Sequence, residues 1–121
     1  MRRLERMQWY GLLAAPLAWC VQLVVGFGAA DANCSRGSMH WGIPVGAWEA
    51  GLTAGAAVIA VSAELTALAL YRELRDVHDD APGPRGRLHF FSIAALAGNV
   101  LFIGVITLTA VGVFSHLGCR Q

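Results

Sequence analysis

The sequence has few charged residues and no lysine. Only 14% of its 121 residues are charged, whereas a soluble domain of this size carries roughly a quarter. A hydrophobic content of 56% and a mean hydropathy of +0.54 are too high for a small soluble domain. The formal net charge of +1 also argues against a general nucleic-acid binder, because binding phosphates needs a concentrated basic surface. The composition therefore predicts a membrane protein.

Familiar catalytic and repeat motifs are absent as well. The sequence contains no phosphate-binding glycine loop, metalloprotease histidine pair or nucleophile elbow. It also has no internal repeat, no low-complexity tract and no coiled-coil heptad. We therefore expect a chain that is not an enzyme and that has no cofactor of its own.

Three long stretches are nearly free of charge. They cover 9–30, 45–71 and 90–115, and only two acidic residues interrupt the second. Each stretch exceeds the roughly 20 residues that a helix needs to cross a bilayer. The sequence predicts a single all-α transmembrane domain over 1–121, with three helices at about 9–30, 45–78 and 88–116.

The first stretch has a competing interpretation as a secretory signal. A basic start at Arg2 and Arg3 is followed by an apolar run and by the small residues Ala30 and Ala32 around Asp31, which is the pattern of a cleavage site. The apolar run is longer than the 7 to 15 residues usual in such signals. We therefore expect a retained transmembrane helix.

The arginines predict the orientation of the chain. Seven of the nine precede the first helix or lie in the connection after the second. The positive-inside rule places them in the cytoplasm, which puts the N-terminus inside, the C-terminus in the periplasm and the protein in the bacterial inner membrane. The seven are Arg2, Arg3, Arg6, Arg72, Arg75, Arg85 and Arg87, and the other two are Arg36 and Arg120.

Aromatic and small residues fit this arrangement. Aromatic residues occur near the expected helix ends, where their apolar rings and polar tips suit the membrane interface. These anchors are Trp9, Tyr10, Trp41, Trp48 and Tyr71. Small residues at four-residue spacing allow close helix packing, and they form such a face at Ala47, Gly51 and Gly55, with pairs at Gly11 and Ala15 and at Gly26 and Ala30.

The three cysteines divide into one inside a span and two outside. Cys20 lies within the first span and is expected to behave as a small apolar residue. Cys34 and Cys119 both fall on the outer side, where an oxidising compartment favours a disulfide. That bond would close a loop of roughly 85 residues and contribute about 4 to 5 kcal/mol. Free thiols, or attachment of a metal or haem, are the alternatives.

Two carboxylates lie within the second stretch. Glu49 is one turn from its outer end, about 6 Å deep, where it can reach water or headgroups, and Glu64 is about 12 Å from the inner boundary. An ionisable group at depth is costly unless it is protonated, paired or facing protein. Asn99 falls at nearly the same depth on the third helix, so it is the predicted partner of Glu64. Candidate partners of Glu49 are Gln22, Thr109 and His116.

The role of Glu64 has three interpretations. It could form an interhelical hydrogen bond worth about 1 kcal/mol, with Asn99 or with a subunit of a larger complex. It could relay protons, or it could extend toward the inner interface. The histidines leave one further option, because His40 and His116, with Met39, could bind copper on the outer side. None of the histidines lies deep enough in a span to bind haem in the membrane.

The layout resembles a group of small bacterial membrane proteins encoded beside haem-copper terminal (cytochrome c) oxidases. The resemblance rests on the run Gly11-Leu12-Leu13-Ala14-Ala15-Pro16-Leu17-Ala18-Trp19 followed by Gln22, and on the cysteines at Cys34 and Cys119. It implies an accessory or assembly role in a cytochrome oxidase of the respiratory chain. It supplies no catalytic or cofactor-binding residue.

These observations predict a non-catalytic accessory subunit of an electron-transport complex. Its small-residue faces, together with Glu64 and Asn99, would pack against a larger membrane subunit, and a groove could hold phospholipid. The alternative is a small self-associating transporter or proton-conducting protein that uses Glu49 and Glu64. Three helices enclose little space, so that alternative requires an oligomer. A haem-bearing electron carrier is disfavoured by the depth of the histidines.

Overall fold

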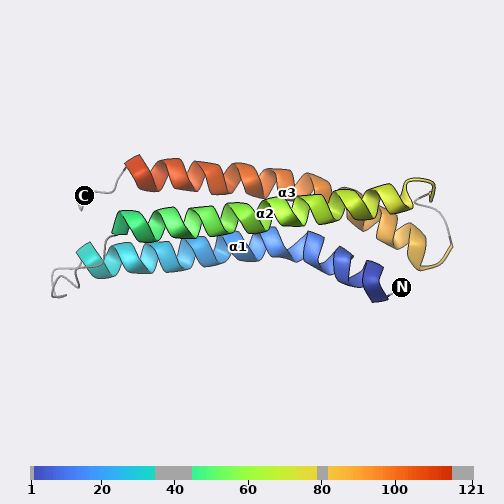
Figure 1. Ribbon diagram of the computed structural model, residues 1–121, viewed down its shortest axis with the longest axis horizontal. Coiled ribbons are helices and arrows are strands. Elements are labelled where there is room, and N and C mark those ends of the chain that lie inside the picture. The colour runs from blue at the N-terminus through green and yellow to red at the C-terminus, as the bar shows by residue number, and fades with distance from the viewer. Residues whose placement is uncertain (1, 35–44, 79–81, 116–121) are drawn as a thin grey trace.

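The described part of the chain is a bundle of three long helices. The computed structural model describes residues 2–34, 45–78 and 82–115. Helix α1 spans Arg2–Cys34, α2 spans Val45–Leu74 and α3 spans Pro84–Ser115. Each pair of helices is in contact, with α1 and α3 parallel and α2 antiparallel to both (Figure 1). Within these residues, the all-α class and helices long and apolar enough to cross a membrane are confirmed.

The side chains are distributed in the opposite way to those of a soluble bundle. Large apolar residues cover the outside, and Phe27, Leu101 and Leu108 each expose 70% or more of their surface. Water would penalise this arrangement, whereas hydrocarbon lipid does not. The interior holds mostly small or polar side chains. This distribution, together with the three apolar helices of the described residues, defines a multi-pass membrane protein.

The buried positions recur every three or four residues, which is the spacing of a heptad repeat. The prediction that the sequence contains no coiled-coil heptad was therefore wrong. Alanine, glycine and polar residues fill most of these positions in place of leucine and isoleucine, and the lipid-facing positions are equally apolar, so the period does not stand out. The buried residues of α2 are Glu49, Ala56, Ala60, Ala63, Ala67, Leu70 and Leu74. Their counterparts are Gln8, Gly11, Ala15, Ala18, Gln22 and Gly26 in α1, and Leu88, Ser92, Ala95, Asn99 and Ile106 in α3.

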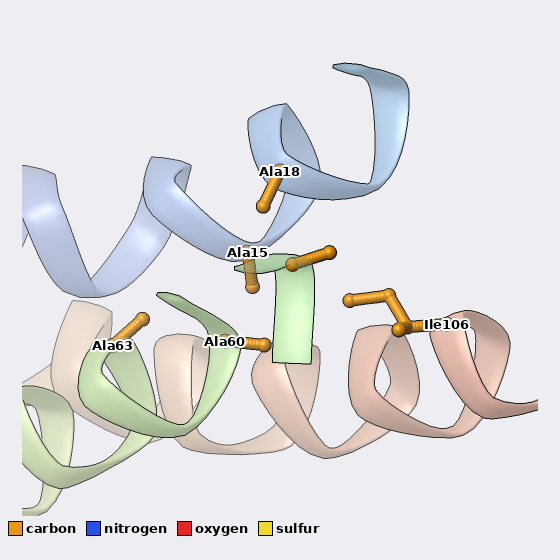
Figure 2. Close-up of a cluster of buried hydrophobic side chains, with 6 residues drawn as sticks. Ala15, Ala18, Ala60, Ala63 and Ile106 are labelled. Carbon is orange, nitrogen blue, oxygen red and sulfur yellow. The ribbon is translucent and has the colours of Figure 1, made fainter. Parts of the chain in front are cut away.

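Alanines form the middle of the core. Figure 2 shows Ala15 and Ala18 of α1 facing the ribbon of α2, which carries Ala60 and Ala63, with Ile106 of α3 beside them. Methyl groups let helix backbones approach closely, and close packing drives helix association in lipid. This alanine cluster fixes the spacing of all three helices.

Leucines form a second core cluster at the end of the bundle that contains the N-terminus. Leu70, Leu74 and Leu88 are almost fully buried, and Leu4 and Met7 of α1 pack against them. These contacts explain why α1 begins at Arg2, seven residues before the predicted start near 9. The prediction followed the charge-free stretch, but apolar packing extends the helix through its arginines.

The connection between α2 and α3 lies about four residues earlier than predicted. Helix α2 ends at Leu74 and not near 78, because the chain turns there and the Val77 N–H donates to the Leu74 carbonyl at 2.9 Å. Pro84, expected in the linker, is the first residue of α3. Proline suits that position because the first helical N–H needs no partner. Gly83 precedes it with φ at +96°, a conformation that favours glycine.

Candidate functional site

Glu49 lies inside the bundle, against the backbone of α1. A Cβ atom added to Gly26 would lie 2.8 Å from Glu49 Oε1, so the carboxylate occupies the space that a side chain would fill. Glu49 is 2% exposed, although the sequence suggested that it reaches water or headgroups. The glycine makes room for it between the helices. This contact sets the register of α1 against α2.

One turn away, the same two helices are joined by a hydrogen bond. Gln22 Nε2 donates to Thr53 Oγ1 at 3.1 Å, while Gln22 Oε1 is buried and has no hydrogen-bond partner in the part of the chain that the structure describes. Gln22 was a predicted neighbour of Glu49 and lies one turn from it. Thr109, another candidate, pairs elsewhere, and His116 is outside the described residues.

Asn99 joins α3 to α1. Its side chain is 1% exposed, and Nδ2 donates to the Gly11 carbonyl at 2.9 Å. Gly11 has no side chain to cover that carbonyl. Asn99 is thus turned toward α1 and not toward its predicted partner Glu64. The Oε2 atom of Glu64 is buried and has no hydrogen-bond partner among the described residues.

Two further interhelical hydrogen bonds come from aromatic residues. The Tyr10 hydroxyl lies 2.6 Å from Ser62 Oγ, and Ser62 already donates to the Ile59 carbonyl, so Tyr10 is the donor. Trp19 Nε1 donates to Thr109 Oγ1 at 3.3 Å. Tyr10 was predicted to be an interface anchor, and neither bond was predicted from the sequence.

A stacked ring pair ties α2 to α3 near the leucine cluster. The Tyr71 and His89 rings lie 5.7 Å apart with an interplanar angle of 28°. Tyr71 was predicted to anchor at the membrane interface, and it also packs between the helices. The Ser92 hydroxyl donates to the His89 carbonyl at 2.7 Å. Arg3 and Glu73 approach to 3.8 Å nearby, but both are exposed, so the pair contributes little.

The described arginines gather at one end of the bundle. The N-terminal end of α1 lies at the same end as the connection between α2 and α3 (Figure 1). Arginines from all three helices therefore share this end. They are Arg2, Arg3, Arg6, Arg72, Arg75, Arg85 and Arg87.

The predicted disulfide cannot be located in the structure. Cys34 is the last residue of α1, but its side chain lies outside the described residues, as do Cys119, His40 and Met39. The disulfide therefore stays a prediction. Cys20 is a free, exposed thiol on the surface of α1.

A groove runs along the outside of α1 and α2. It has a volume of about 880 Å³, and its lining is almost wholly apolar. Ala47, Gly51 and Gly55, predicted as a helix-packing face, line this groove, and none of them packs inside the bundle. A Cβ atom added to Gly51 or Gly55 would meet nothing within 4 Å. The small-residue face is therefore open toward the membrane.

The two carboxylates of α2 lie far apart. Glu49 and Glu64 are 15 residues apart on α2, about 22 Å along the axis, and the alanine cluster lies between them. Within the described residues, no three histidine, cysteine or acidic side chains meet to form a metal site.

These features define an α-helical multi-pass membrane bundle tied by buried polar contacts. The chain matches no known family model, no curated protein and no solved structure.

Proposed function

We propose that this chain is a non-catalytic accessory or assembly subunit of a bacterial respiratory complex, with a haem-copper cytochrome oxidase as the first candidate. It acts by packing against a larger membrane subunit. The proposal needs no cofactor of its own and no nucleic-acid partner, and phospholipid fills the remaining surface.

One observation carries this proposal. Several polar side chains of the spans join the chain's own helices, as Asn99 does with Gly11, Gln22 with Thr53 and Tyr10 with Ser62. The outer surface is apolar and has an open groove lined by glycines. A bundle built in this way offers a surface for binding within the membrane. The oxidase assignment is supported by the sequence resemblance around Gly11 to Trp19.

The location follows from the charges. We propose the bacterial inner membrane, with the N-terminus in the cytoplasm and the C-terminus in the periplasm. The support is the collection of seven arginines at one end of the bundle, because positive charge is retained on the cytoplasmic side.

Affinity purification from native membranes in a mild detergent tests the proposal. We expect larger oxidase subunits to co-purify, with a haem spectrum in proportion to them. Recovery of copies of this chain alone, without another membrane protein, would contradict it.

A second candidate function is supported by Glu64, whose Oε2 atom is buried without a partner. An unpaired carboxylate inside a membrane helix is a typical component of a proton pathway. In that case an oligomer reconstituted into liposomes would conduct protons, and Glu64→Gln would abolish conduction without disturbing assembly. An accessory subunit would show no conduction with either residue.

A further inference from the structure

Charge is divided unevenly among the three helix ends that meet at the arginine-rich end of the bundle (Figure 1). At the end of α2, the two arginines are balanced by Glu73 and Asp76. At the start of α1, only Glu5 opposes three arginines, and the described residues of α3 include no acidic residue. Asp79 and Asp80 of the connection lie outside the described residues. The described positive charge therefore collects on α1 and α3, and its residues, called the α1–α3 patch below, are Arg2, Arg3, Arg6, Arg85 and Arg87.

The two helix starts that carry this patch share one core. Leu4 and Met7 of α1 pack against the leucine cluster, to which Leu88 of α3 belongs. The arginines next to these residues in the sequence are therefore held on neighbouring helices. All five arginines of the patch are exposed. Among the described residues their one ion pair is the 3.8 Å contact of Arg3 with Glu73, so most of the guanidinium groups are available to an anion from outside the chain.

An exposed aromatic ring lies one turn further into the bundle on each of the two helices. Trp9 follows Arg6 by three residues, and Phe90 follows Arg87 by three residues. Residues at this spacing lie on the same face of a helix. Tryptophan favours the membrane interface, and the Arg6 backbone is about 4.5 Å further from the hydrocarbon than that of Trp9. The patch therefore lies at the level of lipid headgroups.

The chemistry of the patch suits a phosphate group. Every basic side chain in it is an arginine, whose planar fork can bond two phosphate oxygens at once. Helices α1 and α3 begin at this end of the bundle, whereas α2 ends there. The positive ends of two helix dipoles therefore add to the charge of the arginines. Clusters of arginine beside membrane helices are typical sites for anionic lipid headgroups.

A polyanion from solution suits the patch less well. The formal net charge of the whole chain is only +1, and nucleic-acid binding needs a concentrated basic surface. A lipid headgroup is already held at the level of the arginines by its acyl chains. The exposed rings of Trp9 and Phe90 provide an apolar surface for those chains on the same two helix faces.

We propose that the α1–α3 patch is a binding site for an anionic phospholipid, with the arginines on its phosphate and with Trp9 and Phe90 beside its acyl chains. This site goes beyond the proposed function, because lipid binding at the patch does not depend on the identity of a larger subunit.

Lipid titration followed by native mass spectrometry tests the proposal. The purified chain in a mild detergent receives either phosphatidylglycerol, which is anionic, or phosphatidylcholine with the same acyl chains, which has no net charge. One arginine near an anionic headgroup contributes about fivefold in affinity. We expect the first phosphatidylglycerol to bind at least about tenfold more tightly than the first phosphatidylcholine. Equal affinities for the two lipids would overturn the proposal, and they are the result expected if the patch serves an acidic protein or a nucleic acid.

Two double variants locate the site. The first, Arg6→Gln with Arg87→Gln, removes two charges from the patch. The matched control, Arg72→Gln with Arg75→Gln, removes the same charge from the end of α2. We expect the affinity for phosphatidylglycerol to fall about twenty-five-fold in the first variant and less than about fivefold in the control. Equal losses would show that only the net charge matters, and would refute the patch as the site.

The folding of the variants is checked separately. All four arginines are exposed, so both double variants should unfold at the same detergent composition as the unmodified chain when no lipid is added. Arg87→Gln alone, with Arg72→Gln as its control, gives the same comparison if a double variant does not fold. The loss expected from Arg87→Gln is then about fivefold, and an equal loss from Arg72→Gln would refute the patch.

Inorganic phosphate separates a lipid site from a site for a soluble phosphate compound. It is added to the complex with phosphatidylglycerol, and chloride at the same ionic strength is the reference. We expect the lipid to remain bound to the same extent in both salts, because its acyl chains hold it beside the patch. Displacement of the lipid by phosphate, but not by chloride, would overturn the assignment to a phospholipid.

Discussion

Asn99 of α3 and Gly11 of α1 are joined by a hydrogen bond, in which Asn99 Nδ2 donates to the Gly11 carbonyl oxygen at 2.9 Å. The link depends on both residues, since the glycine leaves its carbonyl uncovered and the asparagine is long enough to reach it. It also directs the amide away from Glu64. Asn99, which was predicted to be the partner of Glu64, therefore joins α3 to α1.

Replacing Asn99 by leucine should weaken the bundle. Asn99→Leu removes an interhelical hydrogen bond, and such bonds contribute about 0.6 to 1.7 kcal/mol in membrane proteins. We expect the free energy of unfolding in mixed detergent micelles to fall by about 1 kcal/mol. The matched control is Thr107→Val, because Thr107 is exposed and bonds only to its own helix. Equal stability of Asn99→Leu and the unmodified chain would show that the bond contributes nothing.

Gly26→Ala should be destabilising even though alanine favours helix formation. Its Cβ atom would lie 2.8 Å from Glu49 Oε1 and 3.2 Å from Glu49 Cδ, so the carboxylate must move. Because Glu49 is 2% exposed, its carboxylate has little space to move into, and overpacking of a buried site costs about 1 to 3 kcal/mol. Gly28→Ala is the control, because a Cβ atom there would meet nothing within 4 Å, and we expect it to be neutral or slightly stabilising.

A double-mutant cycle tests whether Glu49 is the cause. In a Glu49→Ala background the space beside Gly26 is free, so Gly26→Ala should lose most of its cost. We expect a coupling free energy of about 0.5 to 3 kcal/mol from unfolding measurements on the four variants. Additive effects would mean that the two residues do not contact each other.

The alanine cluster should tolerate no larger side chain. Ala60 is 0% exposed, and Ala60→Leu would force α1 and α2 apart. We expect a loss of about 1 to 3 kcal/mol in the free energy of unfolding. Ala54→Leu, on the exposed side of the same helix, should stay within about 0.5 kcal/mol of the unmodified chain. Similar losses for the two variants would argue against the observed packing of α2.

The disulfide predicted between Cys34 and Cys119 can be tested by counting thiols. The chain is denatured in SDS without reductant and treated with a maleimide mass tag. We expect one tag, on Cys20, before reduction and three after it, because a disulfide blocks two of the three thiols. Three tags before reduction would show that both outer cysteines are free thiols.

The sequence predicted the helices better than it predicted their ends. Charge-free stretches mark the part of a helix that is suited to lipid, and α1, α2 and α3 contain all three stretches. The start of α1 at Arg2 depends on Leu4 and Met7 packing against the leucine cluster, which is a tertiary contact. The start of α3 at Pro84 was missed because a proline that breaks a helix interior is favoured in the first turn.

The interior was harder to predict than the spans. Ala56, Ala60, Ala63 and Ala67 are buried and have the spacing of a heptad, which is a signal present in the sequence. In a membrane helix the lipid-facing positions are apolar too, so hydropathy does not separate inside from outside. Residue size does separate the inside from the outside, because small residues in the core let the helix backbones approach closely. The pairing of Asn99 with Gly11 depends on the relative placement of two helices, which no local pattern contains.

The most direct test of the account is the mass of the assembly that this 12.9 kDa chain forms when it is released from native membranes. Native mass spectrometry in a mild detergent measures it, and controlled dissociation in the same instrument identifies the components. The account predicts a complex in which this chain is bound to a larger, different membrane subunit. A spectrum containing only the single chain or whole-number multiples of its mass would contradict it.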